Sequence, residues 1–121
     1  MKKQHILICD DEPGIRGALR LILENSYSLD FAENGKQAVD YLRKNHADLL
    51  VMDIKMPQKN GMDALTEIKQ IKPKQKILIL TGYESYDVAS EAIRLGASDY
   101  LTKPFEREQV WQKVGSILSV A

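Results

Sequence analysis

The sequence predicts an α/β fold in which five strands form a parallel sheet with helices packed against it. Short apolar runs alternate along the chain with segments whose apolar residues recur at helical spacing, and this alternation is typical of βα units. A length of 121 residues suits one domain with one ordinary core. We therefore expect residues 1–121 to form a single domain without a linker, repeat or low-complexity segment.

Five short runs rich in apolar residues are the expected strands: His5 to Cys9, Ser28 to Ala32, Leu49 to Met52, Lys76 to Leu80 and Asp99 to Leu101. The first and fourth runs are almost continuously apolar, as in central parallel strands that are covered on both faces. The second run is more polar, and we therefore expect it at an edge of the sheet.

Helical spacing predicts one helix after each strand. The first begins at Pro13, because proline is tolerated in a first helical turn, and Ile15, Leu19 and Ile22 share one of its faces. Gly96 is a typical C-terminal cap for the fourth helix. The remaining helices are expected at about Asn34 to Lys44, Met62 to Ile71, Glu84 to Leu95 and Glu106 to Val120.

Composition excludes several classes of function. Seventeen basic and seventeen acidic residues give a net charge of zero, so the chain lacks the basic excess of nucleic-acid-binding proteins. No apolar run approaches the roughly 20 residues of a membrane span, and none follows the basic N-terminus as a signal peptide would. We expect a cytoplasmic protein that binds neither DNA nor a membrane. The single cysteine, Cys9, is expected to be a small buried apolar residue.

Polar residues follow four of the five strands. Asp10, Asp11 and Glu12 come after the first strand, Asp53 after the third, Thr81 after the fourth and Lys103 after the fifth. Because the carboxyl ends of parallel strands meet at one edge of a sheet, we expect these side chains to share a pocket.

This set of side chains indicates phosphoryl chemistry at a metal ion. Clustered carboxylates repel one another unless a cation is present, and hard oxygen ligands favour Mg²⁺, which Mn²⁺ could replace. Such an ion would neutralise charge on a phosphoryl group moving to Asp53, while Lys103 and the Thr81 hydroxyl hold its other oxygens. Asp53 would then be the nucleophile.

Each residue alone also has an ordinary explanation. Acidic residues are favourable before any helix, and Asp53, Thr81 or Lys103 could be loop residues without chemistry. The joint occurrence at four strand ends favours the functional interpretation.

The chain resembles, over its whole length, the receiver domain of two-component response regulators, which are signalling modules phosphorylated on aspartate. The matching residues are Asp10-Asp11, Asp53 with Met56-Pro57 and Asn60-Gly61 in its loop, Thr81, and Lys103-Pro104-Phe105. The resemblance implies strand order 2-1-3-4-5, with five helices on both faces of a flavodoxin-like, doubly wound sheet.

The resemblance also implies roles for individual residues. Asp53 is the phosphoacceptor, Asp11 a direct Mg²⁺ ligand, Asp10 a ligand mainly through water, and the Lys55 backbone carbonyl a further ligand, with Glu12 outside the first shell of ligands. Thr81 would move toward the phosphoryl group, and Tyr100 would be the aromatic switch residue. A cis peptide is expected between Lys103 and Pro104. The chain departs from the common family pattern at Asn60 and Gly82, neither of which affects the proposed chemistry.

The implied partners are a sensor histidine kinase or histidine phosphotransfer protein as donor, an output domain or protein as receiver of the signal, and a second copy of the chain upon phosphorylation. The output would contact the surface of the fourth helix, fifth strand and fifth helix. Trp111 is either a contact residue on this side or a cover for the core edge. Lys55 and Tyr83 are expected at the mouth of the pocket, where their bulk would slow hydrolysis of the phosphoryl group. His5 and His46 are not expected to carry phosphate.

Three rival interpretations remain open on the sequence. A flavodoxin-like nucleotide binder needs a loop rich in Gly, Ser or Thr after the first strand, where this chain has Asp10-Asp11-Glu12. A phosphatase with an aspartate nucleophile would carry a second Asp at the position of Lys55. A binding module that switches without phosphate would not need the intact acidic set. We therefore expect a signalling domain that catalyses only its own phosphotransfer and slow dephosphorylation, not an enzyme.

Overall fold

A computed structural model describes residues 3–55, 60–82 and 86–119 of the chain. Five parallel strands form one sheet in the order β2-β1-β3-β4-β5, which confirms the expected topology and places the polar second strand at an edge. The strands are β1 (His5–Cys9), β2 (Ser28–Ala32), β3 (Leu49–Asp53), β4 (Ile77–Thr81) and β5 (Asp99–Thr102).

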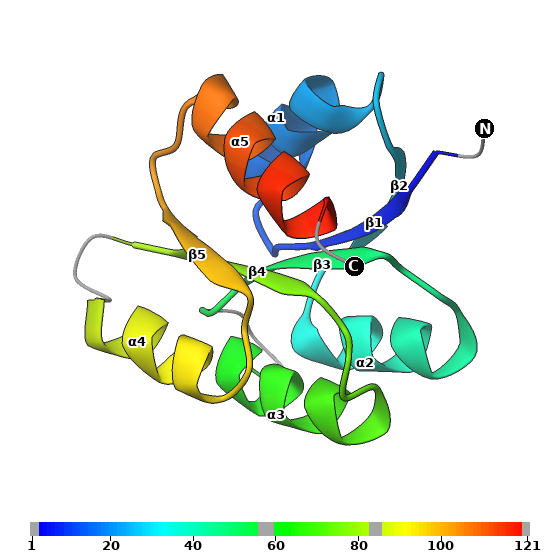
Figure 1. The fold of residues 1–121 in the computed structure, drawn as a ribbon, viewed down its shortest axis with the longest axis vertical. Helices are drawn as coiled ribbons and strands as arrows, with labels where there is room; N and C mark the ends of the chain where they lie inside the picture. Colours follow the sequence, from blue (N-terminus) through cyan, green and yellow to red (C-terminus); the bar gives the residue numbers. More distant parts are fainter. Residues whose placement is uncertain (1–2, 56–59, 83–85, 120–121) are drawn as a thin grey trace.

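The helices cover both faces of the sheet. As Figure 1 shows, α1 and α5 lie on one face, and α2, α3 and α4 lie on the other. Their bounds are α1 (Pro13–Leu23), α2 (Gly35–Lys44), α3 (Gly61–Ile71), α4 (Tyr86–Arg94) and α5 (Arg107–Leu118). Among the described residues, none of these helices combines the length and apolar character that a bilayer span requires.

The sheet separates two apolar cores, because successive side chains of a strand point to opposite faces. In β1, Leu7 and Cys9 pack toward α2 and α3, whereas Ile6 and Ile8 pack toward α1 and α5. The central strands β3 and β4 are buried along their whole length. This double burial explains why their sequences are continuously apolar rather than alternating.

Local capping explains where several helices begin and end. Pro13 occupies the first turn of α1 as predicted, and the side chains of Asn34 and Asn60 accept hydrogen bonds from the backbone at the starts of α2 and α3. These two asparagines therefore precede their helices as N-caps. Gly96, with a φ of +116°, follows α4 in the left-handed conformation expected of a C-terminal cap.

Predicted boundaries were wrong by one or two residues at several ends. Strands β3 and β4 each extend one residue further than predicted, to Asp53 and Thr81, because the β3–β4 ladder continues to the Asp53–Leu80 pair and the β4–β5 ladder to the Thr81–Thr102 pair. Helix α5 ends at Leu118 rather than Val120, which lies outside the described residues, as does the predicted start of α4 at Glu84.

Candidate functional site

The carboxyl ends of β1, β3 and β4 and the segment after β5 meet around one cavity of about 400 Å³. All four predicted groups of polar residues contribute to it, so segments far apart in the sequence converge as predicted. The lining residues are Asp11, Glu12, Asp53, Ile54, Lys55, Thr81, Gly82 and Lys103. Asp10 lies beside these residues and is fully buried.

Lys103 links the carboxylates of this cavity. Its Nζ lies 2.9 Å from Asp10 Oδ2, 3.2 Å from Asp53 Oδ2 and 3.3 Å from Glu12 Oε1. One ammonium group thus contacts three carboxylates that come from two different strand ends. The peptide between Lys103 and Pro104 is cis, as expected.

Asp53 is 6% exposed at the end of β3. Burial raises the pKa of its carboxyl group above the ordinary value, and the negative charge of Asp10 adds to this effect, although Lys103 opposes it. The other carboxylate oxygen, Oδ1, accepts a hydrogen bond of 3.3 Å from the backbone N–H of Lys55. Asp53 is therefore a nearly buried acid whose negative charge is only partly compensated by its neighbours.

The pKa of Lys103 is raised as well. Burial alone would lower the pKa of this amine, but the hydrogen bond to Asp10 and the charge of Asp53 outweigh it. Lys103 therefore keeps its positive charge at neutral pH and can hold an anionic oxygen at this position.

The acidic residues fit a divalent cation. Asp10, Asp11, Glu12 and Asp53 each place one carboxylate oxygen such that all four atoms lie within 4.8 Å of one another. A set made only of oxygen ligands suits Mg²⁺ or Mn²⁺ rather than a softer metal. Glu12, which the family pattern implied to be outside the first shell of ligands, belongs to this group by distance, although its side chain is 61% exposed.

Asp10 is held from several directions. Its Oδ1 accepts a 2.9 Å hydrogen bond from the N–H of Glu12, and its backbone carbonyl accepts a 2.7 Å bond from Arg16. Arg16 was not among the residues expected at this site from the sequence. Helical spacing could have found it, since Arg16 is three positions before the buried Leu19 and therefore lies near the inner face of α1.

Thr81 and Tyr100 lie on neighbouring strands. Thr81 is 2% exposed at the end of β4, and its hydroxyl donates a weak 3.4 Å hydrogen bond to the carbonyl of Gly82. Tyr100 on β5 pairs with Ile79, two positions before Thr81, so the three side chains share one face of the sheet. The ring of Tyr100 is half-buried against the core beneath α4, with Lys113 Nζ 5.6 Å from its centroid.

Other residues named from the sequence lie away from the cavity or outside the described residues. Trp111 is 48% exposed on α5, and its indole N–H donates to the Ile22 carbonyl at 2.7 Å, so it ties α5 to α1 and presents a surface. His5 and His46 lie at the amino ends of strands and bond to Tyr41 and Asp48, respectively. Met56, Pro57 and Tyr83 are outside the described residues.

Comparison with known proteins agrees with this geometry. Residues 6–115 match the family described as the response regulator receiver domain. The chain is 38% identical over 115 residues to protein CcdB of Bacillus subtilis (strain 168), covering 93% of this chain and 96% of that protein. It is 36% identical over 120 residues to the chemotaxis protein CheY of Halobacterium salinarum, covering 98% and 99% of the two chains.

Solved structures lead to the same family. A response regulator receiver domain protein from Clostridium thermocellum superposes with a TM-score of 0.89 at 31% identity, covering 96% of this chain and 94% of that one. The family match, the strand order and the convergence of acidic, hydroxyl and amino groups at one sheet edge agree with one another. The chain belongs to the receiver domains of two-component response regulators, which have a phosphoacceptor role in signalling.

Proposed function

We propose that Asp53 accepts the phosphoryl group, from a phosphohistidine on a sensor histidine kinase or histidine phosphotransfer protein. The single observation that carries this proposal is the position of Asp53: a nearly buried carboxylate that lines the cavity and contacts Lys103 at 3.2 Å. No other acidic residue of the described cavity combines burial with access to this opening, since Asp11 and Glu12 are exposed and Asp10 does not line it.

In the transfer step, a carboxylate oxygen of Asp53 attacks the phosphorus atom, the new O–P bond forms, and the P–N bond to the donor imidazole breaks. The electron pair of that bond remains on the imidazole nitrogen. Lys103 supports the step because its ammonium already lies between Asp10 and Asp53, where phosphoryl oxygens would arrive. Among the described residues, the Thr81 hydroxyl has only a weak 3.4 Å partner, so it would be able to bond a phosphoryl oxygen.

Mg²⁺ would be held by Asp11 directly, by Asp10 mainly through water, and by Asp53 and the Lys55 backbone carbonyl; Mn²⁺ could substitute. When bound, the ion supplies positive charge that stabilises the transferring phosphoryl group. Asp10 is preorganised for this role because Arg16, the Glu12 N–H and Lys103 fix its backbone and both carboxylate oxygens.

Phosphorylation would act as a switch through Thr81 and Tyr100. If Thr81 moves toward the new phosphoryl oxygens, space opens on the face of the sheet that Tyr100 shares, and the ring can turn inward. This movement would alter the α4-β5-α5 surface, which an output domain, an output protein or a second copy of the chain would contact. We do not expect this domain to bind nucleic acid or a membrane directly.

The lifetime of the phosphoryl group would be long. Lys55 is exposed and lines the cavity, so its side chain would hinder the entry of a hydrolytic water. The domain would therefore catalyse only its own phosphotransfer and a slow self-dephosphorylation. We also propose that residues 1–121 form a single receiver domain. The protein would be located in the cytoplasm, where a phosphohistidine donor is available.

A small acyl phosphate such as acetyl phosphate tests this function without knowledge of the donor. With Mg²⁺, the intact mass of the wild type should increase by one phosphoryl group, whereas Asp53→Asn should gain none. Asp40→Asn is a matched control, because Asp40 is an exposed residue of α2 away from the cavity. Phosphorylation of Asp53→Asn at the wild-type level would contradict the proposal, and repeated turnover of a phosphorylated small molecule would favour a phosphatase.

A further inference from the structure

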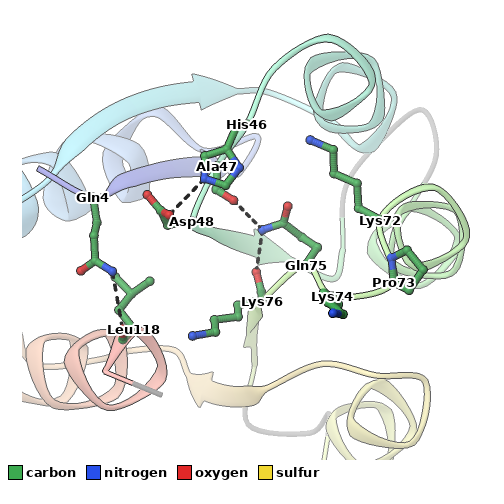
Figure 2. A pocket seen from close by; sticks show the side chains of 10 residues that line it. All are labelled: Gln4, His46, Ala47, Asp48, Lys72, Pro73, Lys74, Gln75, Lys76 and Leu118. Carbon is green, nitrogen blue, oxygen red and sulfur yellow. Dashed lines mark hydrogen bonds and ion pairs between the residues drawn. The ribbon is translucent and has the colours of Figure 1, made fainter. Parts of the chain in front are cut away.

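A second cavity lies at the end of the sheet opposite Asp53, among the residues that the structure describes. It measures about 560 Å³ and is formed where the chain enters β3 and β4, next to the end of α5. Figure 2 shows this cleft, with His46, Ala47 and Asp48 above and Lys76 and Leu118 below. Its volume is in the range of small-molecule sites.

The charge around this cleft is positive. Lys72, Lys74 and Lys76 all line it, and Asp48 is the only acidic residue among its lining residues. Asp48 is already engaged, since its Oδ2 accepts a 2.7 Å hydrogen bond from the N–H of His5 and its Oδ1 lies 3.0 Å from His46 Nε2. The backbone hydrogen bond from His5 lowers the pKa of the Asp48 carboxyl group. Asp48 therefore remains negatively charged, and both of its carboxylate oxygens already have partners.

Internal hydrogen bonds fix the loop that carries the lysines. Lys69 Nζ bonds the carbonyls of Pro73 and Gln75 at 3.3 and 2.7 Å. Gln75 is only 7% exposed, and its amide donates to the carbonyls of Ala47 and Lys76 at 3.0 and 3.1 Å. The cleft is thus preformed, which reduces the entropic cost of binding a ligand.

Two of the ammonium groups are held at opposite sides of the cleft. Lys72 Nζ bonds the carbonyl of Asn45 at 2.7 Å, and Lys76 Nζ bonds the carbonyl of Ile117 at 3.1 Å. In Figure 2 these two amines lie on opposite sides of Gln75. Ala47, Pro73 and Leu118 contribute apolar side chains to the wall of the cleft.

We propose that this cleft binds a small organic dianion with an acidic group at each end of a short apolar body. The two lysines would bind the two acidic ends, and the apolar wall would cover the middle of the ligand. Each ammonium has three donors and can contact an anion alongside its existing partners. The ligand would not compete with Mg²⁺ or the phosphoryl group, because they occupy the opposite edge of the sheet.

A series of linear dicarboxylates tests the proposal. Succinate, adipate and suberate are titrated into ¹⁵N-labelled protein, with hexanoate as a matched monocarboxylate. One member of the series should bind about three- to five-fold more tightly than hexanoate, as expected for one additional exposed ion pair. The largest shifts should occur at the backbone amides of residues 46–48 and 72–76.

Charge-removing variants identify the site. Lys72→Gln and Lys76→Gln should each abolish the advantage of the dicarboxylate over hexanoate, whereas the exposed Lys36→Gln on α2 should not change it. All three variants should still accept one phosphoryl group from acetyl phosphate, which separates this test from that of Asp53. Equal binding of mono- and dicarboxylates at every length, or shifts spread over lysines of the whole surface, would overturn the proposal.

Discussion

Among single residues, Asp53 shows most clearly that a side chain suited to the site can be unfavourable for the stability of the folded domain. Its carboxyl group is nearly buried beside the fully buried Asp10, and the one ammonium group of Lys103 contacts both. Desolvation of charged groups is unfavourable even when they are paired. The arrangement is thus suited to receiving a cation and a phosphoryl group rather than to the stability of the empty domain.

Asp53→Asn should therefore stabilise the metal-free protein. The amide replaces a carboxyl group whose pKa is raised by burial, and the side chain keeps its size. In EDTA, the variant should have a higher thermal unfolding midpoint than the wild type. A lower midpoint for Asp53→Asn in EDTA would mean that the carboxylate stabilises the fold.

Cys9 provides a pH-dependent contribution to stability. Burial raises the pKa of its thiol from 9.0 to about 12, so the folded state holds this proton through a range of pH in which the unfolded chain loses it. The contribution is fully present below about pH 9 and declines as the pH rises toward 12.

Urea unfolding of the wild type and Cys9→Ala measures this effect. Between about pH 8 and about pH 10.5, the free energy of unfolding of the wild type should fall by about 2 kcal/mol more than that of the variant. The loss of the sulfur atom itself changes stability equally at both pH values. Parallel pH profiles for the two proteins would show that the thiol does not titrate in this way.

At the scale of elements, the sequence predicted the number, type and order of the strands and helices. Apolar period and capping residues are local signals, and these signals were strong at Pro13 and Gly96. Strand ends were less predictable. Whether Asp53 and Thr81 belong to a strand depends on ladder partners on β4 and β5, which local sequence does not reveal.

Glycines at two helices give opposite predictions. A Cβ at Gly17 in α1 would meet nothing within 4 Å, whereas a Cβ at Gly61 would lie 2.6 Å from the Asp53 carbonyl oxygen and from Ile54 Cα. Gly17→Ala should stabilise the domain by about 1 kcal/mol, since alanine is the better helix former. Gly61→Ala should destabilise it and slow phosphorylation, because it displaces the backbone of Asp53.

Chemical denaturation and the acetyl phosphate assay check both variants. If Gly61→Ala were as stable and as reactive as the wild type, the close approach of α3 to the end of β3 would not constrain the site. Gly17→Ala is its matched control for the phosphorylation rate, because the substitution lies on an open part of α1.

At the scale of the molecule, the fold places its chemistry at one edge and leaves the two cores apolar. The sequence indicated this site because four polar groups follow four strand ends, and the parallel topology brings such ends together. It did not reveal the contact of Glu12 with Lys103, since this contact depends on the side-chain directions of both residues. Those directions follow from packing rather than from spacing.

Metal binding should stabilise the whole domain through this edge. Mg²⁺ relieves repulsion among carboxylates that come from two strand ends, so saturating Mg²⁺ should raise the unfolding midpoint of the wild type, and EDTA should reverse the increase. The increase should be smaller in Asp53→Asn, which has lost one ligand. An equal increase in both proteins would indicate that the ion binds elsewhere.

The most direct test of the account locates the phosphoryl group on the chain. Wild-type protein is phosphorylated with acetyl phosphate and Mg²⁺ and then treated with borohydride, which reduces an aspartyl phosphate to homoserine. We predict that peptide mass spectrometry finds homoserine at position 53 alone. Homoserine at position 10 or 11, or its absence from phosphorylated protein, would contradict the assignment of Asp53 as the phosphoacceptor.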